Sequence, residues 1–170
     1  MAKLKVASLF CGCGGTDVGL LGNFDFLGKH YASNDMEIVY ANDIDDNACK
    51  IFEENFGLKP DNRDIRKIAS NELPDFDILT GGFPCQPFSV AGLMQGVDDF
   101  MGRGTMLHHI VRILKVKKPK YILLENVKGF LSEKFKDTRE ALSEMLKEIG
   151  YSTFENSSFV CTLLNTNDYG

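Results

Sequence analysis

Two side chains in the sequence have the types needed for nucleophilic and acid catalysis, and each follows a short apolar run. Cys85 stands in the segment GGFPCQPFS, directly after DFDILT, and Glu125 ends the run KYILLE. An apolar run that stops at Gly, Pro or a charged residue is typical of a buried strand that ends there. Because open α/β sheets bind ligands at the carboxyl ends of their strands, a thiol nucleophile and a carboxylic acid would face one cleft.

Both residues also have simpler interpretations. Cys85 could be a packing cysteine, and Glu125 could be a solvated loop carboxylate paired with Lys128. If Glu125 is instead partly desolvated at its strand end, burial favours the protonated form and suits the side chain to donate a proton.

A glycine-rich turn, FCGCGG at residues 10–15, precedes a candidate helix. Glycines let a ligand approach the backbone and a helix N-terminus offers free N–H donors, so a nucleotide-like cofactor would fit, although a tight turn explains the same residues. Asp43 stands where such folds bind a ribose hydroxyl pair, unless it caps the next helix. Asp64 and Ile65 could close over an adenine with one polar and one apolar contact.

Apolar runs alternate with segments of helical periodicity along the whole chain. The pattern predicts strands at 5–10, 37–43, 75–82 and 120–127, with one or two more in 151–165. It predicts helices from Asp17 to about Leu27, from Asp45 or Asp46 to Phe56, from Thr105 to about Val116, and through Leu142 to Gly150. This alternation indicates one α/β domain with a mostly parallel sheet and helices on both faces.

Composition narrows the function classes. The 170 residues are 44% hydrophobic and 25% charged, without an apolar run of membrane-span length or a signal peptide, which favours an intracellular globular protein. The net charge of −5 argues against a large phosphate-binding face. The lysine run at 115–120 either contacts phosphate or complements a helix dipole, and the second interpretation is favoured.

Neither the cysteines nor the histidines are spaced as metal ligands. The five cysteines include no CxxC pair, and His30, His108 and His109 form no ligand cluster. We therefore expect reduced thiols and no metal.

The blocks FCGCGG, GGFPCQPFS and ENV, in this order and spacing, resemble the signature blocks of the DNA (cytosine-5)-methyltransferase family. The resemblance implies a Rossmann-like, S-adenosylmethionine-dependent fold and methyl transfer to C5 of a cytosine flipped out of duplex DNA, as in restriction-modification. It makes Cys85 the nucleophile and Glu125 the cytosine-binding acid. The implied cofactor-binding residues are Phe10, Gly12, Gly14, Gly15, Asp43, Ile44, Asp64, Ile65 and Pro84. The implied substrate-binding residues are Pro84, Gln86, Ser89, Arg103 and Asn126.

The chemistry accounts for these residue types. C5 of cytosine is too poor a nucleophile to accept a methyl group unless a thiolate first adds at C6. A carboxyl group at N3 and the exocyclic amine stabilises the charge that develops. A base stacked in a duplex is inaccessible to both groups, so the base must be flipped out.

The chain ends at LNTNDYG, which resembles the start of a family block that continues into an arginine-bearing segment. That arginine, the target-recognition region and a C-terminal segment of the family do not follow. We therefore expect residues 1–170 to be a catalytic and cofactor-binding domain that is incomplete at its C-terminus. It would work with duplex DNA and a second polypeptide in a prokaryotic cytoplasm, at the nucleoid, and would not methylate DNA alone. Two alternatives stay open: a noncatalytic cofactor-binding or interaction fragment of the same fold, and a tRNA cytosine-5 methyltransferase.

Overall fold

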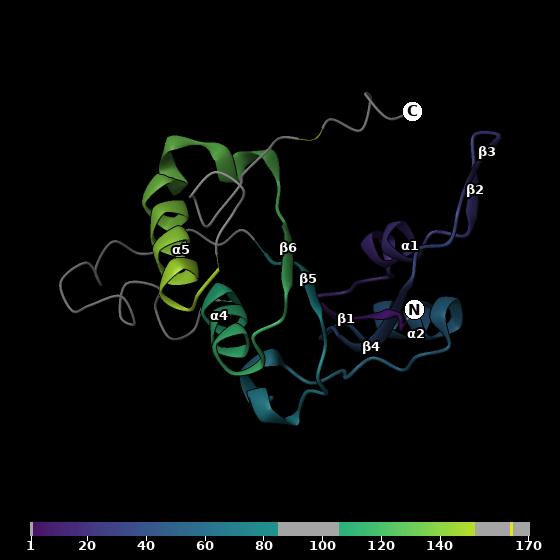
Figure 1. Cartoon of the computed structure of the whole chain (residues 1–170), viewed down its shortest axis with the longest axis horizontal. Helices are drawn as coiled ribbons and strands as arrows, with labels where there is room; N and C mark the ends of the chain where they lie inside the picture. Colours follow the sequence, from purple (N-terminus) through teal and green to yellow (C-terminus); the bar gives the residue numbers. More distant parts are fainter. Residues whose placement is uncertain (1, 85–105, 152–163, 165–170) are drawn as a thin grey trace. The chain divides into compact units, whose positions relative to one another are not determined.

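The computed structural model describes residues 2–84, 106–151 and 164 (Figure 1). The chain forms two compact units: one comprises Met1–Phe83 with Val116–Glu125, the other Pro84–Lys115 with Asn126–Gly170. Within the described ranges, no helix has the length and apolar character of a membrane span.

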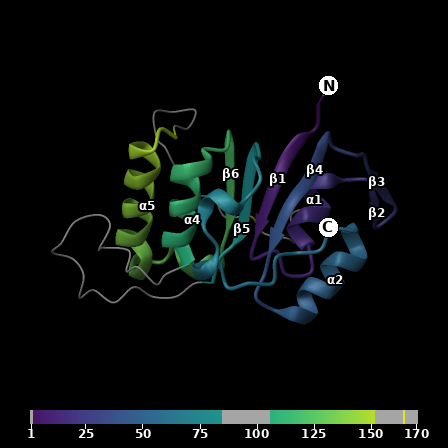
Figure 2. The same cartoon turned by 90° about the horizontal axis from the view of Figure 1, so that it is seen from below.

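The first unit is built on a four-stranded parallel sheet in the order β4-β1-β5-β6 (Figure 2). Its strands are β1 Leu4–Leu9, β4 Met36–Asn42, β5 Ile78–Gly82 and β6 Tyr121–Glu125. In register, Leu9 lies opposite both Asn42 and Gly81, and Gly82 lies opposite Glu125. The carboxyl ends of all four strands therefore lie at the same end of the sheet, which confirms the predicted parallel arrangement.

The second predicted helix is confirmed as α2, Asp46–Phe56. Asp45 caps it by accepting hydrogen bonds from the N–H groups of Asn47 and Ala48, and Gly57, at φ 66°, ends it. Its buried face carries Phe52, which packs in a cluster with Cys11 and Ala41. This cluster joins α2 to the turn after β1 and to the end of β4.

The predicted helix from Asp17 to Leu27 is too long. Helix α1 spans Gly15–Leu21 and ends because Gly22 and Asn23 adopt φ 66° and 60°, outside the helical region. Two short antiparallel strands follow, β2 Phe24–Phe26 and β3 Lys29–Tyr31. Both residues of the connecting turn, Leu27 and Gly28, also have positive φ, as a two-residue hairpin requires.

The lysine run after α4, Met106–Lys117, forms ion pairs at the amino ends of the strands. Lys117 pairs with Asp75 at 3.1 Å and Lys120 with Asp77 at 2.7 Å, just before β5 and β6 begin. These lysines lie where the strands begin, at the opposite end of the sheet from Glu125, which supports a structural role over phosphate binding.

The second unit contains most of α4 and the whole of α5, Lys136–Glu148. Helix α4 was predicted from Thr105, which lies outside the described residues, to about Val116. Of the apolar residues at helical spacing, which predict the core faces, six are buried: Ile110, Ile113 and Leu114 in α4, and Leu142, Met145 and Leu146 in α5. Met106 and Ile149, at the same spacing, are only half-buried. Two 3₁₀ turns, Lys128–Leu131 and Glu133–Phe135, precede α5. The strands predicted in 151–165 lie almost wholly outside the described residues.

Candidate active site

The glycine turn after β1 has an unusual backbone. Phe10, Gly12 and Gly14 all have positive φ, at 54°, 53° and 90°. A bulky residue in this region is rare and strained, and such strain is concentrated at functional sites. A Cβ on Gly14 would stand 2.0 Å from Phe56 Cε2, whereas a Cβ on Gly12 would meet nothing within 4 Å. The turn is therefore pressed onto α2 at Gly14 and open at Gly12.

Asp43 follows β4 directly and joins that strand to the glycine turn. Its Oδ2 accepts a 2.8 Å hydrogen bond from the Gly12 N–H, and its Oδ1 accepts one of 2.9 Å from the Asp45 N–H. The cap of α2 is Asp45, so the alternative that Asp43 is merely that cap does not hold. A carboxylate has about four acceptor positions, and two remain for ligand hydroxyls.

The main chain of Asp43 is held from its other side. Its carbonyl accepts hydrogen bonds from the Cys49 thiol at 3.4 Å and from Asn62 Nδ2 at 3.1 Å. Carboxylate and carbonyl are thus both fixed before any ligand arrives.

Asp64, in the segment that follows α2, carries an ionised carboxylate. The Arg66 guanidinium donates to it at 2.8 Å through Nε, and the Arg66 N–H donates at 2.9 Å. These contacts lower the pKa of Asp64 to about 2. Ile65, by contrast, is only 3% exposed, so its side chain packs in the core and does not offer the apolar contact expected for an adenine. Ile44, beside Asp43 and 67% exposed, offers an apolar surface instead.

Glu125 ends β6, the edge strand of the sheet. An ideal Cβ on Gly82, its partner in register, would lie 3.2 Å from Glu125 Oε2, so the absence of a side chain there makes room for the carboxylate. The partial desolvation predicted for Glu125 is not observed. Tyr121, Leu123 and Glu125 lie on one face of β6 and are all exposed. Glu125 belongs to the first unit and Lys128 to the second, so the alternative that these two residues pair stays open.

Cys85 lies outside the described residues, as do Gln86, Ser89 and Arg103. Of the described thiols, Cys11 is a poor nucleophile, because burial and then the charges of Asp43 and Asp17 raise its pKa to about 12. Cys11, Cys13 and Cys49 are all free thiols. The described ranges hold no group of three His, Cys, Asp or Glu side chains suited to a metal ion.

Pro84 and Asn126, which follow β5 and β6, belong to the second unit. Pro84 is exposed, and the half-buried Asn126 accepts a 2.9 Å hydrogen bond at Oδ1 from the Val127 N–H. Within the first unit, the structure brings Gly12 to Asp43 and Glu125 to Gly82.

Several residues that sequence reasoning did not single out hold this arrangement: Asn42, Cys49, Asn62 and Gly82. Asn42 had a detectable signal, because an amide at the end of an apolar strand, 2% exposed in the structure, must find hydrogen-bond partners. The contacts of Cys49 and Asn62 depend on how the loop after α2 returns, which no local pattern reports.

The chain is similar in sequence and in fold to several known proteins. The chain is 38% identical over 170 residues to the Type II methyltransferase M.HhaI of Haemophilus parahaemolyticus and 38% identical over 167 residues to M.FnuDI of Fusobacterium nucleatum. These alignments cover 100% and 98% of this chain but 46% and 43% of the relatives, so the chain spans about half their length.

Among solved structures, the Dnmt2 methyltransferase of S. pombe aligns with a TM-score of 0.61 and 26% identity over 88% of this chain and 42% of that protein. The DNMT2 of Spodoptera frugiperda aligns with a TM-score of 0.59 and 29% identity over 86% of this chain and 41% of that protein. The family model for C-5 cytosine-specific DNA methylase matches residues 4–170. A parallel sheet that gathers the glycine turn, Asp43 and Glu125 at one edge, together with that match over nearly the whole chain, places this protein in the C-5 cytosine-specific DNA methylase family.

Proposed function

We propose that this chain forms the cofactor-binding and catalytic part of an enzyme that transfers a methyl group from S-adenosylmethionine to C5 of a cytosine flipped out of duplex DNA. The observation that carries the proposal is that the glycine turn, Asp43 and Glu125 all lie at the carboxyl ends of neighbouring parallel strands. Family membership supports the reaction, and the Type II relatives support a restriction-modification role.

The residues at the first two strand ends fit an adenosyl cofactor. Gly12 and Gly15 have open space where a side chain would stand, so a ligand can approach the backbone there. Asp43 retains lone pairs for the ribose hydroxyls, Ile44 offers an apolar face, and Asp64 offers an ionised acceptor for an exocyclic amine. The cofactor, when bound, supplies an electrophilic methyl group. We assign the pocket to these residues together with Phe10, Gly14, the main chain of Ile65, and Pro84.

The other two strand ends fit the base. Glu125 is exposed at the sheet edge, where its carboxyl group can meet N3 and the exocyclic amine of a cytosine. Cys85 follows Gly82 by three residues. We assign Cys85 as the thiol nucleophile, and family membership supports the assignment. Addition of the Cys85 thiol to C6 and hydrogen bonding of the Glu125 carboxyl group to the base are the two protein contributions to activating C5.

Duplex binding needs more than this acidic chain offers. Base readout and phosphate contacts require groove-facing and cationic side chains, whereas the net charge here is −5. We therefore assign the whole activity to this chain together with the remaining length that its relatives carry, whether continuous or supplied by a second polypeptide. The substrate site of that complete enzyme then also includes Gln86, Ser89, Arg103 and Asn126. We place the enzyme in a prokaryotic cytoplasm, at the nucleoid.

The test is transfer of a labelled methyl group to duplex DNA and, separately, to tRNA, with the completing polypeptide present. DNA labelling should fall at least about 100-fold in Glu125→Gln and stay unchanged in Glu133→Gln, an exposed carboxylate outside the sheet. Labelling of tRNA alone would replace DNA with RNA as the substrate, and labelling of neither would support a noncatalytic fragment.

A further inference from the structure

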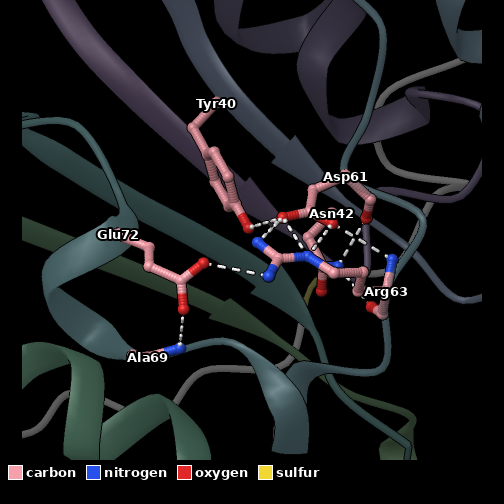
Figure 3. Close-up of polar contacts among 6 residues, drawn as sticks. All are labelled: Tyr40, Asn42, Asp61, Arg63, Ala69 and Glu72. Atoms are coloured by element: carbon pink, nitrogen blue, oxygen red, sulfur yellow. Dashed lines mark hydrogen bonds and ion pairs between the residues drawn. The ribbon is translucent and has the colours of Figure 1, made fainter.

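A group of hydrogen-bonded side chains, none of them assigned to the site above, lies beside the carboxyl end of β4. It consists of Tyr40, Asp61, Arg63 and Glu72, and we call it the Arg63 network (Figure 3). We propose that the Arg63 network sets the affinity for the adenosyl end of the methyl donor by fixing the backbone of residues 61–65, with Arg63 as its central positioning residue. This inference rests on the proposed function.

Arg63 is clamped between two carboxylates. Its guanidinium donates to Asp61 through Nε at 2.9 Å and through a terminal nitrogen at 2.7 Å, and its other terminal nitrogen donates to Glu72 at 2.9 Å. Paired donors on one carboxylate fix orientation as well as distance, since the guanidinium fork is planar. One cation therefore ties the segment after α2 to the 3₁₀ turn Ser70–Glu72.

The same segment is anchored to the sheet. The Asp61 N–H donates to the Ala41 carbonyl at 2.8 Å, and Asn42 Nδ2 donates to the carbonyls of Asp61 at 2.6 Å and Arg63 at 2.8 Å. The Tyr40 hydroxyl donates to Asp61 Oδ2 at 3.2 Å. Asp61 thus lies beside β4 in an isolated parallel bridge to Asn42, whose amide also holds the Arg63 carbonyl (Figure 3).

The three charged groups of the network, one guanidinium and two carboxylates, are all ionised at neutral pH. The Arg63 hydrogen bonds lower the pKa of Asp61, and the Ala69 N–H, followed by Arg63, lowers the pKa of Glu72. Burial and the Asp61 carboxylate raise the pKa of Tyr40, so its hydroxyl stays a donor. The network is therefore fully formed under the conditions of catalysis.

Both residues whose carboxylates are assigned to the cofactor are connected to this segment. Asn62 donates to the Asp43 carbonyl at 3.1 Å, and Asp64 follows Arg63 directly in the chain. Small displacements at a binding site weaken hydrogen bonds that depend on geometry. Loosening residues 61–65 should therefore weaken the adenosyl contacts while the buried core of β1 and α2 stays intact.

The test measures the dissociation constant of S-adenosylmethionine by calorimetry, in the presence of the completing polypeptide, at a temperature where every variant is folded by circular dichroism. Arg63→Gln and Glu72→Gln should each raise it about tenfold or more, and Tyr40→Phe should raise it severalfold. Arg63→Lys keeps the charge without the fork and should restore part of the affinity only. Lys120→Gln breaks an exposed ion pair at the opposite sheet edge and should change nothing.

A double-mutant cycle separates positioning from simple stabilisation. If Arg63 acts through Asp64, Arg63→Gln should cost less than about twofold in an Asp64→Ala background. An equal loss of affinity in both backgrounds overturns this inference alone. So does unchanged affinity in Arg63→Gln, Glu72→Gln and Tyr40→Phe beside a parent that binds the cofactor. A parent that binds no S-adenosylmethionine overturns the proposed function and the inference with it.

Discussion

Replacing the glycines of the FCGCGG turn one at a time should produce an ordered series of stabilities. Gly14→Ala places a methyl group 2.0 Å from Phe56 Cε2, 2.6 Å from its Cζ and 3.2 Å from Phe52 Cδ2. These rings pack with centroids 4.4 Å apart in the cluster that joins α2 to the sheet, so neither can withdraw freely. The backbone at φ 90° adds strain for any residue with a Cβ.

The magnitudes follow from these two effects. Overpacking a core costs about 1–3 kcal/mol and left-handed backbone about 1–2 kcal/mol, so Gly14→Ala should lower the unfolding free energy by about 2–5 kcal/mol. Gly12→Ala carries backbone strain only, because no atom lies within 4 Å of the new Cβ, and should lower it by about 1–2 kcal/mol. Gly15→Ala has neither problem, starts α1, and should be neutral or gain up to about 1 kcal/mol.

Urea unfolding followed by circular dichroism measures the series directly, and unchanged slopes would show that the unfolded state is the same in each variant. The reasoning is refuted if Gly12→Ala and Gly14→Ala are equally destabilised, because the Phe56 contact would then have no effect. It is refuted equally if Gly15→Ala is the most damaging of the three.

Two further predictions concern buried or hydrogen-bonded aspartates. Asp43→Ala should weaken S-adenosylmethionine binding, measured by calorimetry, by about 1.5–3 kcal/mol for each ribose hydroxyl that no longer has its acceptor. Asp45→Ala should leave that affinity intact and lower helix stability, measured by urea unfolding, by about 0.5–2 kcal/mol. Equal affinity in Asp43→Ala and the parent would remove Asp43 from the site. Asp17 is fully buried, with one oxygen bonded to the Ser8 hydroxyl and the other without a partner among the described residues, and burial raises its pKa above 3.8. The folded chain therefore holds this proton more tightly than the unfolded chain, so the unfolding free energy should rise as the pH falls through the raised pKa towards 3.8. Asp17→Asn should lack that rise, and parallel pH profiles for parent and variant would contradict the assignment.

Most of the fold was predictable because its strands are mostly apolar and a glycine or an acidic residue stands at or soon after the end of each. Strands β1, β4, β5 and β6 and helix α2 follow the sequence pattern closely. The hairpin at residues 24–31 was not predicted, because its strands are three residues each and depend on two consecutive residues with positive φ at the turn. Helical periodicity extends across such a segment without detecting the backbone change at Gly22.

The candidate site was predictable where chemistry requires a residue type and unpredictable where tertiary contacts decide. Asp43 and Glu125 were identified from their places at strand ends. The buried side chain of Ile65 and the exposed carboxylate of Glu125 differ from expectation, because burial depends on residues distant in sequence that no local pattern reports. The Arg63 network escaped notice because Tyr40 and Glu72 are far apart in sequence.

The most direct test of the central claim is covalent capture of the chain by a DNA duplex that carries 5-fluorocytosine at the target position. Fluorine cannot leave as a proton does after methyl transfer, so the thiol adduct at C6 persists. With S-adenosylmethionine and the completing polypeptide present, we predict a denaturant-resistant complex whose adduct maps by mass spectrometry to Cys85 and is abolished in Cys85→Ala. An adduct at another residue, or capture that survives Cys85→Ala, would contradict the assignment of this chain as the catalytic part of a DNA cytosine-5 methyltransferase.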